Sequence, residues 1–533
     1  MDLTAIPLNV RLGIAFVIMV IVWAMMLYAL ILSILNAIIL HKYKKNRDRV
    51  YAKHTPRQPT PPNEGSSKTK NDDDSKESKY ETIRPETIIG FFHPYCNAGG
   101  GGERVLWTAI REIQDRYPRV VLVVYTGDTD TSKEDIIAKV KACFNIELDP
   151  NMLEFEFLTS RKWVEGSQWP RFTLLGQSLG SIRLAWEALN KVVPDIWFDT
   201  MGYAFTYPLA RILGGCQVAA YVHYPTISSD MIGRVASRES AHNNDASIAS
   251  NPLKSLCKLI YYRAFAVAYR FVASFADHVL ANSSWTKSHV DSLWGTKATL
   301  VFPPCDTQAL SGLALKDRER VILSVSQFRP EKGHGLQLEA LAALLKKHPE
   351  YRAGQPKQVQ LVMLGSARNA GDEARIEQLK DQAKKLGVED NVTFVVNAPF
   401  SELQSWLGRA KVGLHTMRDE HFGIGVVEFM SAGLIAVAHN SAGPKEDIVT
   451  PYKNQKTGYL ATTAEEFAEA IDQVLTMDED KLHDMQLAAR DAVEERFSEK
   501  AFVARFFRPL HKAITGERRV IEGEKLLPGM QTH

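Results

Sequence analysis

The sequence predicts an α/β protein in which two doubly wound, parallel-sheet (Rossmann-like) domains face each other across a cleft. At 533 residues the chain is too long for a single hydrophobic core. Short apolar runs alternate with helical patterns, which is typical of parallel strands joined by crossover helices. A polar, charged break at residues 311–320 divides the runs into two series. The predicted strands are 87–92, 120–125, 195–199, 217–222, 278–281 and 298–302, and then 321–326, 360–364, 392–396, 412–415 and 434–439.

The amino terminus predicts a single-pass transmembrane helix. Residues 12–40 are 29 residues without a charge, and as a helix they would measure about 44 Å at 1.5 Å per residue. A bilayer core is about 30 Å thick, so this segment is long enough to span it with tilt, and it lacks the cleavage site of a signal peptide. A basic flank follows, which places the rest of the chain in the cytosol. We assign the anchor and its flank to residues 1–52; the flank contains Lys42, Lys44, Lys45, Arg47 and Arg49.

Composition divides the remainder. Residues 53–86 are rich in Pro, Ser, Lys and Asp and are expected to form a disordered linker. A flexible chain of this length reaches roughly 30 Å, so it would keep the body near the membrane without fixing it there. We expect a first domain at 87–310, a second domain at 311–493, and a last segment at 494–533. Within these domains, residues 237–251 look like a disordered insertion, and the helix at 494–515 is expected to pack back on the first domain through Phe497, Phe502, Phe506 and Phe507.

Charge and cysteine content exclude several classes of function. Lys and Arg total 64 against 62 for Asp and Glu, so a nucleic-acid partner is not indicated. The five cysteines form no CxxC pair and have no histidine at metal-ligand spacing, which favours reduced thiols. The acidic run at residues 72–74 lies in the linker. We therefore expect a protein that needs no metal and no cofactor.

Glycines and cations follow predicted strands at the cleft. A glycine run after the first strand lets the backbone approach an anion and presents its amides to it. Arg329 and Lys332 follow the first strand of the second domain, in SQFRPEKG. Cations placed there would stabilise the charge that develops on a departing diphosphate. The glycine run consists of Gly99, Gly100, Gly101 and Gly102.

The most informative segment is EHFGIGVVE at residues 420–428. Glu420 and Glu428 flank a Phe-Gly-Ile-Gly turn, and the helix after it should end at Gly433. A buried strand and a second glycine loop at 441–444 follow, so two helix N-termini with free amides should lie side by side. Amides suit a diphosphate, whereas carboxylates suit hydroxyls. The segment therefore predicts a nucleotide-sugar site, with Glu428 placed on the helix to accept ribose hydroxyls.

These residues resemble the retaining glycosyltransferases of the GT-B fold, family 4. Within that family the chain is most similar to the α-1,2-mannosyltransferases of dolichol-linked oligosaccharide assembly. The resemblance covers residues 87–510 and rests on FFHPYCNAGGGGERVLW, YVHYPTIS, SVSQFRPEKGH and EHFGIGVVEFMSAG. It implies GDP-mannose as donor, a dolichyl-diphosphate oligosaccharide as acceptor, and a place on the cytosolic face of the endoplasmic reticulum membrane in protein N-glycosylation. Other mannosyltransferases of the pathway are candidate partners.

The resemblance also implies roles for single residues. Glu420 would contact the transferred sugar and Glu428 the ribose. His223, at a strand end, would lie beside the donor sugar and support the transition state, and His93 would either line the acceptor side or fix its turn. With Arg329 and Lys332, Glu420 and His223 make up the catalytic set. Backbone amides for sugar and diphosphate would come from Phe422, Gly423 and Ile424.

Several alternatives stay open from the sequence. Residues 253–275 form a helix with Lys and Arg that suits either a membrane interface or the domain core. A related transferase that uses UDP-glucose or UDP-GlcNAc would carry the same glutamate motif. A non-catalytic membrane scaffold is the third possibility, although an inactive descendant would be expected to lose several of Arg329, Lys332, Glu420 and Glu428, which this chain retains. The number of mannoses transferred is not fixed by one site, since one site can act twice.

Overall fold

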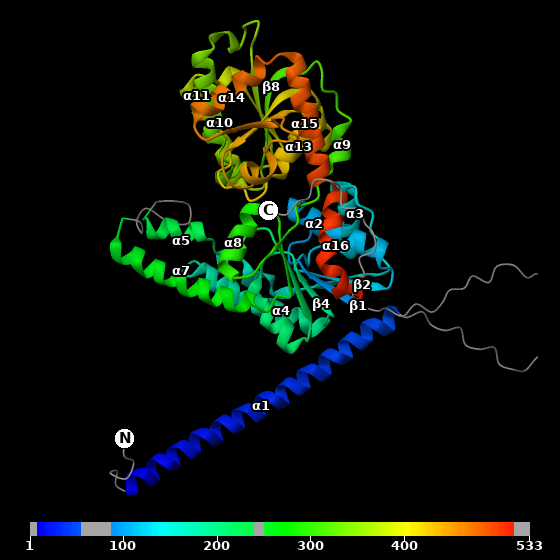
Figure 1. Ribbon diagram of the computed structural model, residues 1–533, viewed down its shortest axis with the longest axis vertical. Coiled ribbons are helices and arrows are strands. Elements are labelled where there is room, and N and C mark those ends of the chain that lie inside the picture. The colour runs from blue at the N-terminus through cyan, green and yellow to red at the C-terminus, as the bar shows by residue number, and fades with distance from the viewer. Residues whose placement is uncertain (1–7, 55–86, 239–249, 516–533) are drawn as a thin grey trace, which may run out of the picture.

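The computed structural model describes residues 8–54, 87–238 and 250–515, and it shows two sheet domains, one above the other (Figure 1). Residues 55–86 of the predicted linker, most of the insertion predicted at 237–251, and the tail after 515 lie outside the described residues. Each domain contains one parallel sheet, so the predicted fold of two Rossmann-like domains is confirmed.

The first sheet has the strand order β3-β2-β1-β4-β5-β6-β7. Alternate residues of its strands belong to different cores: Val121 and Val123 face one hydrophobic cluster, whereas Leu122 and Val124 face the other. Both faces are therefore covered, as in doubly wound sheets. The strands are β1 (Thr87–Phe92), β2 (Val120–Thr126), β3 (Leu153–Phe157), β4 (Ile196–Asp199), β5 (Gln217–Val222), β6 (His278–Ala281) and β7 (Thr299–Leu300).

The second sheet has the order β10-β9-β8-β11-β12-β13. The loops after β8 and β11, which are neighbours in this order, carry Lys332 and Glu420, so the topology brings these two predicted residues to one edge. The strands are β8 (Glu319–Val325), β9 (Gln360–Gly365), β10 (Val392–Val396), β11 (Ala410–His415), β12 (Ile435–His439) and β13 (Gly458–Ala461).

Helices connect the strands of both sheets (Figure 1). In the first domain they are α2 (Gly101–Arg116), α3 (Lys133–Phe144), α4 (Thr173–Lys191), α5 (Ser229–Ala236), α7 (Pro252–Ala273) and α8 (Ser284–Trp294). In and before the second they are α9 (Thr307–Ser311), α10 (His334–Lys347), α11 (Ala370–Leu386), α12 (Phe400–Arg409), α13 (Ile424–Ala432), α14 (Ala464–Leu475) and α15 (Glu479–Phe497).

The chain returns to the first domain at its end. α16 (Glu499–Thr515) buries Phe502, Phe506 and Phe507 in the core of the first sheet. Phe497 differs from the other predicted phenylalanines, because it ends α15 and packs with Phe422 in a cluster of the second domain.

The first helix, α1 (Leu8–His54), is docked on the first domain through its basic end. Arg47 forms an ion pair of 2.7 Å with Asp195, and the Tyr51 hydroxyl donates to the same carboxylate. Tyr43 and Val50 are buried there. The expectation that the body is held near the anchor without being fixed is therefore wrong for this end of α1, because the basic flank makes specific contacts with the domain.

The predicted membrane span is not supported by the described residues. None of the helices, as far as their residues are described, has the length and apolar character needed to cross a bilayer. Most side chains of residues 12–40 lie outside the described set, so the anchor stays a prediction.

Candidate active site

The Phe-Gly-Ile-Gly turn joins β11 to α13 at the cleft edge of the second sheet. Gly423 is the residue before the helix and has φ 110°, a left-handed conformation that favours glycine. α13 ends at Gly433, with φ 88°, as predicted. The amides of this first turn therefore open toward the end of the sheet where ligands bind in such folds.

The second glycine loop packs directly on this turn. The Gly443 amide donates to the carbonyl of Glu420 at 3.0 Å. A side chain at Gly443 would collide with the backbone of Phe422, at 2.3 Å from its carbonyl oxygen. The two loops thus lie side by side, as the sequence indicates. The helix after the second loop is a single π turn, Pro444–Ile448, rather than a full α-helix.

Glu420 lies between the Lys332 ammonium and the His415 imidazole. The Lys332 ammonium donates to its Oε2 at 2.8 Å, and the His415 Nε2 lies 3.3 Å from the same oxygen. Burial alone would raise the pKa of Glu420, but the hydrogen bonds and charges of His415 and Lys332 outweigh burial and hold this pKa well below its usual range. Glu420 is therefore an ionised, fixed acceptor for hydroxyl groups.

Lys332 is placed by a short helical turn, Pro330–Lys332, after β8. Gly333 follows with φ 67°, and a Cβ there would lie 2.9 Å from the carbonyl oxygen of Thr416. The Thr416 hydroxyl also donates to the Gly333 carbonyl at 3.0 Å. These contacts join the loops after β8 and β11, so the ends of two neighbouring strands set the Lys332–Glu420 pair.

Arg329 is not part of this pair. Its guanidinium lies 3.9 Å from Glu331, and its side chain is 41% exposed, compared with 22% for Lys332. The structure therefore brings Lys332 to Glu420 and leaves Arg329 on the rim of the same loop.

Glu428 lies one helical turn into α13 and has a different environment. Burial raises its pKa to about 7, the charge of Arg104 opposes this increase, and Asp306 adds to it. No described residue donates a hydrogen bond to this carboxylate. The group is thus free to accept ligand hydroxyls, as its predicted contact with ribose requires.

The glycine run of the first domain faces the second domain. α2 begins at Gly101, and a Cβ at Gly101 would lie 2.6 Å from Cδ1 of Ile424. The amides of Ala98 and Gly100 donate to the buried Glu103 carboxylate. Part of the run therefore binds an anion within the chain, so fewer of its amides face the cleft than the sequence indicates.

His223 follows β5 and lies beside this run. A Cβ at Gly102 would be 3.4 Å from its Nε2, and that nitrogen is buried with no hydrogen-bond partner among the described residues. Burial, with a smaller contribution from His421, lowers the pKa of His223 to about 4. A neutral imidazole with an unused nitrogen therefore lines the cleft.

His93 follows β1 and is fixed by its neighbours. Its Nδ1 lies 2.7 Å from the Thr200 hydroxyl, and its backbone amide donates to the carbonyl of Tyr125. Burial, and then the charge of His223, lower the pKa of His93 to about 3. Of its two predicted roles, the structure supports the one that fixes the turn.

Several residues of the site were missed from the sequence. His415, the partner of Glu420, is the last residue of a predicted strand, and that position alone signalled a side chain at the cleft. Asp447 of the second domain accepts hydrogen bonds from the amide and hydroxyl of Ser284 in the first. Tyr224 of the first domain stacks on His421 of the second. Contacts between domains have no local sequence pattern that would reveal them.

Two parallel sheets that face each other, with a fixed glutamate, a lysine and glycine-bounded helix N-termini at their edges, define a glycosyltransferase of the GT-B class. Comparisons with known proteins agree. Residues 86–294 match the family described as ALG11 mannosyltransferase N-terminus, and residues 308–492 match Glycosyl transferases group 1.

Relatives with curated names extend the match over both domains. The GDP-Man:Man(3)GlcNAc(2)-PP-Dol alpha-1,2-mannosyltransferase of Dictyostelium discoideum is 51% identical over 442 residues, which are 81% of this chain and 86% of that protein. The human protein of the same name is 49% identical over 433 residues, 80% of this chain and 87% of its own. The chain belongs to this family of mannosyltransferases, and it is a glycosyltransferase.

Solved structures share the fold at much lower identity. Anabaena Alr3699/HepE in complex with UDP and glucose has a TM-score of 0.55 and 16% identity, and the alignment covers 80% of this chain and all of that one. A glycosyltransferase from Rickettsia africae ESF-5 has a TM-score of 0.56 and 14% identity, covering 81% and 100%. These similarities show the GT-B architecture alone.

Proposed function

We propose that the chain transfers mannose from GDP-mannose to the dolichyl-diphosphate-linked trimannosyl-chitobiose core, with two sequential α-1,2 additions in protein N-glycosylation. The observation that carries the proposal is the identity of 49–51% to proteins named for this donor, acceptor and linkage, over most of both domains. The environments of Glu420 and Glu428 support it, because they suit the sugar and the nucleotide respectively.

In the proposed donor complex, Glu428 accepts ribose hydroxyls and Glu420 accepts hydroxyls of mannose. The amides of Phe422, Gly423 and Ile424 lie along the sugar and diphosphate. Lys332 then stands between the diphosphate and Glu420, which it already contacts at 2.8 Å. It can therefore stabilise the leaving group and keep Glu420 ionised.

We propose that the reaction proceeds with retention on the front face of the sugar. The bond between the mannose anomeric carbon and the diphosphate oxygen breaks, and the bond to the acceptor oxygen forms on the same side. The acceptor proton passes to the departing diphosphate oxygen. His223, whose Nε2 is buried and has no hydrogen-bond partner in the described part of the chain, supports the sugar in the transition state. The Arg329 side chain lies on the rim. It contacts the diphosphate after this side chain moves inward from its exposed position.

Metal independence is part of the proposal. Lys332 and the amides of α13 supply positive charge where a metal would otherwise act. The rate with GDP-mannose should then stay within about twofold when EDTA is added. A large loss that magnesium or manganese restores would reject this part.

The membrane is the proposed location, on the cytosolic face of the endoplasmic reticulum. Residues 12–40 would cross the bilayer, and the docked basic end of α1 would hold the first domain close to it. α7, which runs along the outer side of the first domain (Figure 1), supports this placement. One face of α7 packs in the core of the first domain through Tyr262, Phe265 and Tyr269.

The other face of α7 is an exposed apolar stripe at helical spacing. Its sequence contains no acidic residue, and Lys254 and Arg263 lie beside the stripe. An apolar face flanked by cations is the pattern of helices that lie on lipid headgroups. The packed face agrees with the core alternative, and the exposed face is the part of α7 that we propose to lie on the membrane. The stripe consists of Leu253, Leu256, Ile260, Val267 and Phe271.

The test is transfer by the purified full-length chain. We expect GDP-mannose and the trimannosyl lipid-linked core to give a product heavier by two hexoses, sensitive to an α-1,2-mannosidase. Glu420→Ala should nearly abolish transfer, whereas the exposed control Glu469→Ala should not. Faster transfer from UDP-glucose or UDP-GlcNAc would favour a related transferase, and no transfer from any donor by folded protein would favour a scaffold.

A further inference from the structure

Three nearly parallel rings lie across the seam between the domains. Tyr224 and Trp285 belong to the first domain, and His421 belongs to the second. The Tyr224 and His421 rings are 3.9 Å apart at 5°, which is a face-to-face contact. Trp285 lies 5.6 Å from each of the other two, at 9° to His421 and 12° to Tyr224. We call these three residues the ring clasp.

The ring clasp adjoins the site on both sides of the seam. Tyr224 is next to His223 in the chain, and His421 is next to Glu420. The neighbouring side chains go to different places: His223 lies against Gly102 and Tyr221, whereas Tyr224 lies against Trp285. The rings therefore stand beside the site, one residue from each of its two predicted sugar contacts.

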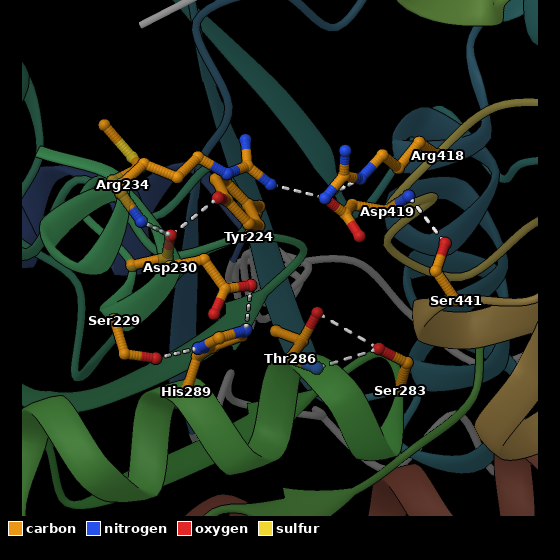
Figure 2. Close-up of polar contacts among 12 residues, drawn as sticks. Tyr224, Ser229, Asp230, Arg234, Ser283, Thr286, His289, Arg418, Asp419 and Ser441 are labelled. Atoms are coloured by element: carbon orange, nitrogen blue, oxygen red, sulfur yellow. Dashed lines mark hydrogen bonds and ion pairs between the residues drawn. The ribbon is translucent and has the colours of Figure 1, made fainter. Parts of the chain in front are cut away.

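An ion pair holds the residue on the other side of Glu420. Arg234 of α5 donates to the Asp419 carboxylate at 2.5 Å, and the Asp419 amide donates to the Ser441 hydroxyl at 2.8 Å (Figure 2). Asp419 has φ 58°, an uncommon conformation for a residue other than glycine, so its position depends on such contacts. The first domain thus contacts both neighbours of Glu420 in the chain, Asp419 and His421.

The first-domain part of the ring clasp is itself braced. The Tyr224 hydroxyl donates to the Ser228 hydroxyl at 3.0 Å. The Trp285 and His289 rings are 4.4 Å apart and nearly perpendicular. The His289 Nδ1 lies 2.6 Å from the Ser229 hydroxyl, a contact that is drawn in Figure 2. Both serines are at the start of α5, the helix that carries Arg234. Rings and ion pair therefore form one connected unit.

We propose that the ring clasp and the Arg234–Asp419 pair are positioning elements that set Glu420 opposite His223 when the domains meet. The inference rests on the proposed function for the role of Glu420. These residues would act by holding Glu420 in place, without contacting the substrate. They are Tyr224, Trp285, His421, Arg234 and Asp419. A displacement of about 1 Å in such a site costs on the order of 100-fold in rate.

The first experiment separates stacking from direct chemistry by His421. His421→Ala removes the ring, whereas His421→Phe keeps a flat ring without nitrogens. We expect His421→Ala to lower kcat by about 10- to 100-fold and to leave the Kd for GDP within about twofold. His421→Phe should stay within about fivefold of the unmodified chain, and Tyr224→Ala and Tyr224→Phe should repeat the pattern.

The opposite outcomes overturn the inference. If His421→Phe is as inactive as His421→Ala, the imidazole nitrogens act directly and stacking is not the role. If His421→Ala is fully active, the rings position nothing. Failure of the proposed function is distinguishable, because the unmodified chain would then give no mannose transfer, whereas failure of the inference appears only as ratios between active variants.

A double-mutant cycle tests the ion pair. Asn tolerates the conformation of Asp419, so Asp419→Asn and Arg234→Met each remove the pair without new backbone strain. We expect each to lower kcat by about threefold to tenfold and the double variant to be no worse than either. The matched control is the Arg409–Glu319 pair, at 2.7 Å on the surface of the second domain. Independent, multiplying losses at Arg234 and Asp419, or equal losses at the control pair, would refute the positioning role.

Discussion

Replacing Glu428 by glutamine should stabilise the protein at alkaline pH and not at acidic pH. Burial raises the pKa of Glu428 from 4.5 to about 7. Below pH 4.5 the carboxyl is protonated in both the folded and unfolded states and makes no difference. Above pH 7 it is ionised in both, and the folded state bears the full cost of a buried charge. Stability contributed by the protonated group is thus lost as pH rises from 4.5 to 7.

The magnitude follows from the shift. The raised pKa corresponds to a cost of up to about 3 kcal/mol at 1.36 kcal/mol per unit, and because Glu428 keeps some exposure to solvent we expect roughly 1–3 kcal/mol. For a domain of this size, 1 kcal/mol moves Tm by about 2–4 °C. Glu428→Gln should therefore raise Tm by about 2–12 °C at pH 8 and by much less at pH 5.

Thermal unfolding of the full chain without nucleotide, followed by fluorescence at both pH values, measures this difference. Glu469→Gln, at an exposed position of α14, is the matched control and should change Tm equally little at either pH. If Glu428→Gln raises Tm by the same amount at pH 5 and pH 8, or lowers it at pH 8, then the carboxylate is not buried at a cost. The hypothesis that the Glu428 carboxylate lacks hydrogen-bond donors until ribose binds would then be wrong.

Three further predictions concern the rate and the membrane. Lys332→Met should lower kcat about 100- to 1000-fold in the transfer assay, because it removes the cation between Glu420 and the leaving group. A higher KM with an unchanged kcat would contradict this. Gly101→Val should slow transfer about tenfold, since its side chain meets Ile424 at the 2.6 Å approach, and Ile424→Ala in the same chain should restore part of the rate. Charge reversal at Lys254 and Arg263 should weaken cosedimentation with anionic liposomes and turnover of the lipid acceptor, while unchanged values for both would reject the contact between α7 and the membrane.

Most of the fold could be predicted because parallel strands buried on both faces appear as continuous apolar runs. The two strands that were missed, β3 and β13, are both at sheet edges. β3 (LEFEF) alternates acidic and apolar residues and is half-buried, and β13 has four residues and begins with glycine. Neither has the apolar run on which the prediction depends.

The site was predictable where one local segment determines it. Gly433 ends α13 because a left-handed residue is needed there, and Lys332 and Glu420 meet because β8 and β11 are neighbours. The docking of α1 and the stack of Tyr224 on His421 were not predictable, since each joins surfaces distant in the sequence. A basic flank after an apolar segment indicates the orientation in a membrane, and its sequence looks the same whether or not its arginines also bind the domain. The flank therefore gave no sign of the docking of α1.

The two carboxylates that flank the Phe-Gly-Ile-Gly turn show why identical residue types can divide the work. Both are removed from water, yet the pKa of Glu420 is lowered and that of Glu428 is raised. The difference lies in the donors: Lys332 and His415 contact Glu420, whereas no described side chain donates to Glu428. Glu420 is therefore charged before the donor arrives and can favour positive charge on the sugar as its bond breaks. Ligand hydroxyls would give Glu428 the hydrogen-bond donors that the described side chains do not provide. The Glu428 carboxylate is therefore suited to binding, and the Glu420 carboxylate to the chemical step.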